Sequence, residues 1–270
     1  MTDHLEGRPP AEVAAFYRRL ANHVRALLQG TSVAAELLPH WLDGRGRKRV
    51  VAAYYVKDVS FVKTYLRQEV RRVLLTQKKA HVKPVPVWGG IIPRISRIPP
   101  LDAAPGARTG GPYPMMYEGP SVEIPLDIMA RASMGLSVDP RALDLLYGLH
   151  KFALLTNVVA AVASVPGSTK YQVRFTSWRT RMRDHYDFDP RRHIPVPNPD
   201  HGQSFSNAVA PGERSITVYH KHALRVERAG LATPFHVESE EWQVNDATIS
   251  APAVVDVSRC WSARGVVECR

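Results

Sequence analysis

The densest group of chemically active side chains lies at residues 183–193, where the sequence reads RDHYDFDPRRH. Three carboxylates, one phenol, two imidazoles and three guanidinium groups fall within these eleven positions. Carboxylates that lie close together hold hard divalent cations, and guanidinium groups bind phosphate oxygens in pairs. An imidazole can accept the proton that an attacking water loses. The segment therefore contains the parts of a site that hydrolyses phosphoester or pyrophosphate bonds.

The spacing within this segment resembles the signature of the colicin M family of bacteriocins. That signature is Asp-x-Tyr-Asp, five residues, and then His-Arg; Asp184, Tyr186, Asp187 and His193 meet four of its five defined positions in register. Members of the family are phosphodiesterases that use magnesium to cut lipid II between the undecaprenyl chain and the pyrophosphate. A short motif of this kind predicts a function that its structural context must support.

The resemblance implies a role for each matching residue. Asp187 would be the essential acid, and Asp184, Tyr186 and His193 would complete the catalytic site. Asp184 and Asp187 would hold a Mg²⁺ ion and the attacking water, and His193 would handle the proton. Tyr186 would orient the cluster or donate a hydrogen bond to a phosphate oxygen.

One position of the signature differs in this chain. The arginine that follows the histidine in the family is Ile194 here. Arg191 and Arg192 precede the histidine, and we expect them to bind the substrate phosphate in its place. Whether Ile194 abolishes activity is left open by the sequence.

These observations lead to three functional hypotheses. The first is a bacterial antibacterial toxin or effector that hydrolyses a polyprenyl-linked pyrophosphate of cell-wall synthesis, with an immunity protein as a further partner. The second is a non-enzymatic accessory or interaction protein of a secretion locus, in which residues 184–193 form only a polar turn. Ion pairs in such a turn contribute about 0–1 kcal/mol each. The third is a basic nucleic-acid-binding protein, which we expect less than the other two.

The histidines after the motif offer one more candidate site. His220 and His222 would face the same side of a strand and could bind zinc; His201 and His236 also follow the motif, but the sequence does not identify a third ligand. No carboxylate partner can be chosen from the sequence, so scattered surface histidines are the simpler interpretation.

The composition indicates a globular chain. Of its 270 residues 44% are hydrophobic and 23% charged, and the mean hydropathy is -0.22. The longest apolar run, at 152–165, is shorter than the roughly 20 residues that cross a bilayer. Residues 1–10 resemble no secretory signal. We therefore expect a protein that is cytoplasmic in its producer, reaches the target-cell periplasm by a non-Sec route, and keeps Cys260 and Cys269 as free thiols.

Positive charge is concentrated in one segment. The net charge is +11, and residues 45–83 contain twelve Lys and Arg side chains against two acids, which accounts for ten of these charges. Such a segment favours anionic partners. We expect it to contact an anionic membrane surface near a lipid-linked substrate.

Hydrophobic periodicity predicts an α+β fold, with a helical N-terminal part and a β-rich C-terminal part that forms an open barrel or a twisted antiparallel sheet. We expect helices at 11–29, 32–42, 61–75 and 141–165, a helical turn at 223–229, and strands at 50–56, 171–175, 215–219, 234–237 and 253–257. Residues 84–140 hold eleven of the 22 prolines, which predicts an irregular connector. The expected domains are thus a basic helical region (1–83), this connector (84–140), and a core helix with the β-rich catalytic region (141–270).

Overall fold

The computed structural model describes residues 3–27, 32–76, 110–118, 122–123, 139–149, 151–168, 170–200 and 215–256. The fold is α+β, as the sequence predicts. Contacts divide the chain into two compact units, each made of three segments. Unit 1 contains Met1–Phe61, Glu123–Phe152 and Arg183–Glu240, and unit 2 contains Val62–Val122, Ala153–Met182 and Glu241–Arg270. This division differs from the expected boundaries after residues 83 and 140, because each unit takes strands or helices from distant parts of the chain.

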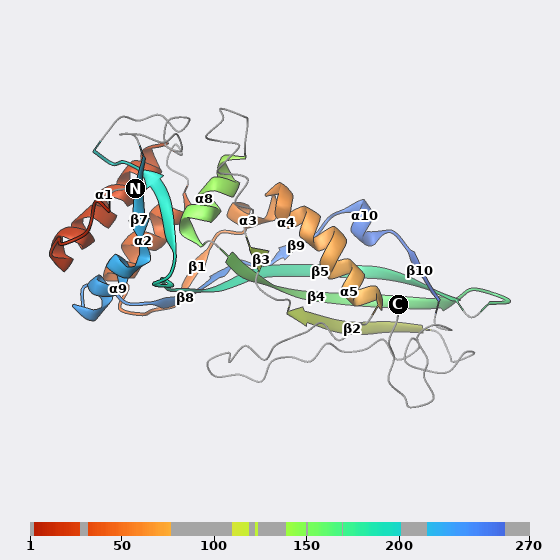
Figure 1. Cartoon of the computed structure of the whole chain (residues 1–270). Helices are drawn as coiled ribbons and strands as arrows, with labels where there is room; N and C mark the ends of the chain where they lie inside the picture. Colours follow the sequence, from red (N-terminus) through yellow and green to blue (C-terminus); the bar gives the residue numbers. More distant parts are fainter. Residues whose placement is uncertain are drawn as a thin grey trace. The chain divides into compact units, whose positions relative to one another are not determined.

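The helices of unit 1 pack around one another (Figure 1). They are α1 (Pro10–Leu27), α2 (Val33–Asp43), α3 (Tyr54–Lys57), α8 (Pro140–Gly148) and α9 (His220–Arg228). Helix α1 buries Val13, Phe16 and Leu20 on one face, which confirms its amphipathic pattern. Helix α2 begins after Ser32, whose hydroxyl accepts a hydrogen bond from the Ala35 N–H at 2.9 Å, as expected of a capping residue.

Helix α8 docks on the start of α2 through a buried carboxylate. Asp144 accepts hydrogen bonds from the Ser32 hydroxyl at 2.7 Å and from the backbone N–H of Ala34 at 3.1 Å and of Val33. These N–H groups have no partner within their own helix, so the carboxylate satisfies them. Gly148 makes the close approach possible, since a Cβ there would lie 3.2 Å from Val33 Cγ1.

The strands of unit 1 form two groups. Strand β1 (Arg49–Val51) pairs in parallel with β8 (Phe235–Ser239), and β8 pairs antiparallel with Arg183–Tyr186, the last residues of β5. Strands β6 (His193–Pro197) and β7 (Ser215–Tyr219) form a separate antiparallel pair. The parallel pairing corrects our expectation of a purely antiparallel sheet. The strand expected at 50–56 is shorter, because α3 begins at Tyr54.

Unit 2 is built on a long hairpin (Figure 1). The hairpin consists of β4 (Lys151–Ser164) and β5 (Lys170–Tyr186), with Gly167 in its turn at φ +69°. Around it lie β2 (Gly110–Glu118), β3 (Val122–Glu123), β9 (Trp242–Gln243), β10 (Ala253–Asp256) and α10 (Ala247–Ser250). A continuous helical stretch, α4 (Ser60–Tyr65), η1 (Leu66–Val70) and α5 (Arg71–Thr76), confirms the helix expected at 61–75.

The helix expected at 141–165 is wrong beyond residue 148. Helix α8 ends at Gly148, and residues 151–164 form strand β4, whose side chains at 152, 154, 156, 158, 160 and 162 are buried. This burial has a period of two, which is that of a strand. Alanine and valine fill the other face as well, and they conceal the alternation in the sequence.

Two strands lie in the range expected to be an irregular connector. Strands β2 and β3 fall within 84–140, and β2 contains Pro112 and Pro114. Strand β2 pairs with β4 and with no other described strand, and its register shifts between Gly110 and Tyr113. Proline is tolerated at edge strands and bulges, because no ladder hydrogen bond is lost there. Residues 77–83 of the basic segment and both cysteines lie outside the described residues.

Candidate functional site

The end of strand β5 positions the first part of the motif. Asp184 and Tyr186 are two residues apart on this strand, opposite Val237 and Phe235 of β8. Side chains two apart on a strand share a face, so both project to the same side. Asp187 follows directly after the strand and is exposed.

These three side chains line one cavity of unit 1, with a volume of about 50 Å³. Arg192, from the loop before β6, lines it as well. The other lining residues are Tyr147, Gly148, Leu149, Lys151, His185, Phe188, Asp189 and His220. One water molecule needs roughly 10–15 Å³ of cavity volume, so the cavity has room for a few water molecules among charged groups of both signs.

Burial and a neighbouring charge both act on the carboxyl of Asp184 in this cavity. Burial raises the pKa of Asp184 well above its usual value, and the negative charge of Asp187 raises it further. The His185 N–H and the charge of Lys151 act in the opposite direction. A positive ion between the two carboxylates would relieve this repulsion.

Two tyrosines of the cavity stay protonated. Burial raises the pKa of Tyr186, and the neighbouring Tyr17 and Asp184 raise it further. Burial also raises the pKa of Tyr147, and within the described part of the chain the buried Tyr147 hydroxyl has no hydrogen-bond partner. A buried hydroxyl without a partner costs about 1–3 kcal/mol. The Tyr147 hydroxyl is therefore available to donate to an anionic ligand.

An aromatic cluster fixes the loop that carries Asp187. The Phe188 ring lies 4.8 Å from Trp41, 5.5 Å from Tyr186 and 6.0 Å from Tyr17, between ring centroids. Such contacts stabilise by about 0.5–1.5 kcal/mol beyond the area they bury. Phe188 therefore anchors the chain immediately after Asp187.

A further carboxylate, that of Glu227, lies near Asp187. Trp41 donates its indole N–H to Glu227 Oε1 at 2.9 Å. Burial raises the pKa of Glu227, the bond from Trp41 lowers it, and the negative charge of Asp187 raises it. Glu227 lies on α9, 34 residues after the last motif residue, His193, so no local spacing in the sequence could identify it.

Two of the six sequence-predicted site residues do not line the cavity. His193 is exposed at the start of β6, where its ring lies 5.3 Å from that of Tyr219. Arg191 is exposed, and its backbone N–H donates to Asp189 Oδ1 at 3.0 Å. The structure thus brings together Asp184, Tyr186, Asp187 and Arg192, and leaves His193 and Arg191 outside the cavity wall.

The cavity carboxylates are of the donor type that magnesium prefers. Mg²⁺ is usually bound through one or two carboxylates, with water and substrate phosphate completing its octahedron. Asp184 and Asp187 provide two carboxylates in one small polar cavity. They therefore match the donor type and number that the resemblance implies.

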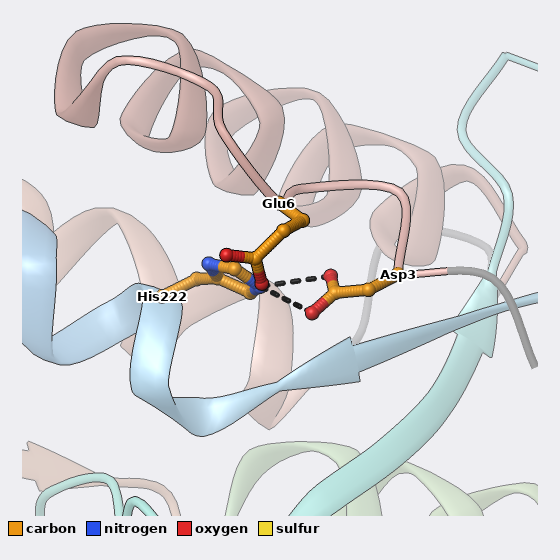
Figure 2. Close-up of side chains that lie close together, drawn as sticks. All are labelled: Asp3, Glu6 and His222. Atoms are coloured by element: carbon orange, nitrogen blue, oxygen red, sulfur yellow. Dashed lines mark hydrogen bonds and ion pairs between the residues drawn. The ribbon is translucent and has the colours of Figure 1, made fainter.

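Asp3, Glu6 and His222 form the only group of three metal-type donors among the described residues (Figure 2). Asp3 Oδ1 lies 2.8 Å from His222 Nε2, and Lys221 Nζ forms ion pairs with both acids. Arg225 lies 3.3 Å from His222 Nδ1.

The contacts of this second group are those of an ion-pair cluster. A guanidinium only donates, so the Arg225 contact favours the tautomer in which His222 Nδ1 accepts and the Nε2 proton faces Asp3. The group links residues 3–6 to α9. His220 and His222 lie on helix α9 and not on a strand, so the shared strand face on which the zinc alternative depends is absent.

Part of the basic segment has internal partners. Lys48 pairs with Glu238 at 2.8 Å, Arg49 with Glu36 at 3.0 Å, and Arg67 with Asp246 at 2.7 Å. Arg71 donates to the carbonyls of Ile249 and Ala251. The side chains of Arg45, Arg47 and Lys57 are exposed. At least four of the twelve cations in this segment thus bind acids or carbonyls of the chain itself.

No described helix combines the length and the apolar character needed to span a bilayer. Comparison of the chain with protein families, with curated proteins and with solved structures gave no match.

Proposed function

We propose that the cavity at the end of β5 hydrolyses a polyprenyl-linked pyrophosphate, of the kind that carries cell-wall precursors. One observation supports this proposal most: Asp184, Tyr186 and Asp187, chosen from the sequence for their spacing, line one cavity together with Arg192 and Lys151. Acids that activate water and cations that bind phosphate are the two requirements of such a reaction.

The residues divide into two functional groups. Arg192 and Lys151 attract the pyrophosphate and stabilise the charge that builds up on its oxygens. The hydroxyl of Tyr186 or Tyr147 donates to a phosphate oxygen, and Asp187 orients the attacking water. The water oxygen bonds to the phosphorus next to the prenyl chain, the bond from this phosphorus to the prenyl oxygen breaks, and the prenyl alcohol takes up a proton.

Magnesium is the expected cofactor of this site. Asp184 and Asp187 would hold the ion, which would neutralise charge on the phosphate oxygens. The resemblance assigns proton transfer to His193, but His193 is exposed and lies outside the cavity wall. On this proposal the protein is an antibacterial toxin or effector that acts in the target-cell periplasm after delivery by a non-Sec route. The producing cell then needs an immunity protein, and exposed cations of the basic segment, among them Arg45, contact the membrane surface that holds the substrate.

The proposal is tested with purified full-length protein and radiolabelled lipid II, with and without Mg²⁺. We expect cleavage that depends on Mg²⁺, and a rate at least about 100-fold lower for Asp187→Asn. Asp187 is exposed, so its replacement should leave folding intact. Asp43→Asn is the matched control, because Asp43 is an exposed aspartate that pairs with Arg18 away from the cavity.

Retention of full activity by Asp187→Asn would refute the assignment of the site. No cleavage by the wild-type protein would instead favour the non-enzymatic accessory role. Circular dichroism of both variants excludes unfolding as the cause of a loss.

A further inference from the structure

Two histidines line the cavity, the exposed His185 and the buried His220, and neither is the motif histidine His193. His220 lines the cavity together with Asp184, Asp187 and Arg192, and its exposed fraction is 2%. His193 is exposed and is not among the lining residues. The cavity thus offers one buried imidazole to a bound phosphate, and it comes from α9.

The position of His220 is fixed from both ends of the motif loop. Its backbone N–H donates to the carbonyl of Arg192 at 3.0 Å. Its ring packs edge-on against Phe188, with centroids 5.2 Å apart and an angle of 89°. Phe188 directly follows Asp187 in the chain. The imidazole is therefore positioned relative to both the acid and the cation that the proposed reaction uses.

The ring is uncharged at neutral pH. Burial lowers the pKa of His220 to about 4, and the charges of Arg192 and His193 lower it as well. A hydrogen bond with the backbone of Asp189 and the charge of its carboxylate raise the pKa of His220. A neutral imidazole has one nitrogen lone pair that accepts a proton, and an anionic phosphate nearby would stabilise the imidazolium that results.

We propose that His220, not His193, is the catalytic imidazole of this cavity. The inference rests on the proposed function. His220 accepts a proton from the attacking water as the water oxygen bonds to phosphorus. The bond from phosphorus to the prenyl oxygen breaks, and the imidazolium returns the proton to that oxygen. The products are a prenyl alcohol and a pyrophosphoryl headgroup, and the histidine is regenerated.

The first test compares His220→Gln with His193→Gln in the lipid II assay. We expect His220→Gln to lower kcat at least about 100-fold with little change in KM, as general acid–base catalysis predicts. We expect His193→Gln to stay within about threefold of the wild type, because His193 lies outside the cavity wall. Thermal unfolding of both variants checks that each is folded.

A second readout separates catalysis from a structural role. In His220→Gly, added imidazole should restore part of kcat, since a free imidazole can enter the space that the side chain leaves. The same imidazole should not restore Asp187→Asn. If His220 only supports the fold, added imidazole should not restore kcat in His220→Gly or in Asp187→Asn.

A third readout does not depend on activity or on any variant. Inorganic pyrophosphate added to ¹⁵N-histidine-labelled wild-type protein should shift the ring signals of His220 and leave those of His193 unchanged. Shifts of His193 alone would overturn the inference.

The outcomes also separate this inference from the proposed function. The role of His220 would be overturned, and the proposed function left in place, by one pattern of activities. In that pattern the wild type and His220→Gln are fully active, while Asp187→Asn and His193→Gln are inactive. A wild-type protein that does not cleave lipid II would overturn both.

Discussion

Two aspartates of unit 1, Asp144 and Asp184, differ in what surrounds them. Asp144 is enclosed by the Ser32 hydroxyl and two backbone N–H groups, which use its oxygens fully. Asp184 opens on a cavity that also contains Asp187 and Arg192. The first carboxylate therefore stabilises a helix junction, while the second faces the cavity in which we propose the reaction.

The titration of Asp144 should be visible in the stability of the protein. Burial raises its pKa to about 6 from 3.8, although the hydrogen bonds from Ser32, Val33 and Ala34 lower it. The folded state then binds this proton more tightly than the unfolded state. Its stabilising effect is complete below about pH 4 and is lost as the pH rises through about 6.

The measurement is the free energy of unfolding of the wild type minus that of Asp144→Asn, from denaturant titrations between pH 3.5 and 7.5. We expect this difference to fall by about 2–3 kcal/mol as the pH rises. Other titrating groups cancel between the two proteins. A difference that stays constant or grows with pH would show that the pKa of Asp144 is not raised.

The packing of α8 on α2 shows how elements position the site. Gly148 ends α8 and lines the cavity. A Cβ at this position would lie 3.2 Å from Val33 Cγ1 and 3.3 Å from the Ala34 backbone nitrogen. That nitrogen cannot move easily, because its N–H is bonded to Asp144.

Gly148→Ala should therefore destabilise the protein by about 1–3 kcal/mol. Helix propensity alone predicts the opposite sign, a gain of about 1 kcal/mol. In a double-mutant cycle, Val33→Ala removes the nearest methyl group. The loss of unfolding free energy in the double variant should therefore be smaller than the sum of the losses in the two single variants, by at least about 0.5 kcal/mol. Chemical denaturation of the four proteins measures this coupling, and strict additivity would contradict the packing described.

The elements show what sequence patterns could and could not predict. Helices α1 and α2 were predictable, because each has one apolar face and α2 has a capping serine. Strand β4 was not, because both of its faces carry small or branched apolar residues. In the site, one local spacing predicted Asp184, Tyr186 and Asp187 together. His220, Glu227 and Tyr147 reach the same region from other helices, so only tertiary packing could bring them into view.

At the scale of the whole molecule, charge has two roles. The surplus of +11 resides mainly in residues 45–83, but several of those cations bind acids or carbonyls within their own unit. Surface ion pairs of this kind contribute about 0–1 kcal/mol each, so they guide local packing more than overall stability. The cations that line the cavity, Arg192 and Lys151, are the ones that bear on the proposed chemistry.

The central claim is that water attacks phosphorus in this cavity. The most direct measurement is lipid II cleavage in H₂¹⁸O with Mg²⁺, followed by mass spectrometry of both products. We predict one ¹⁸O atom in the pyrophosphoryl headgroup and none in the prenyl alcohol. No cleavage, or ¹⁸O in the alcohol, would contradict the account.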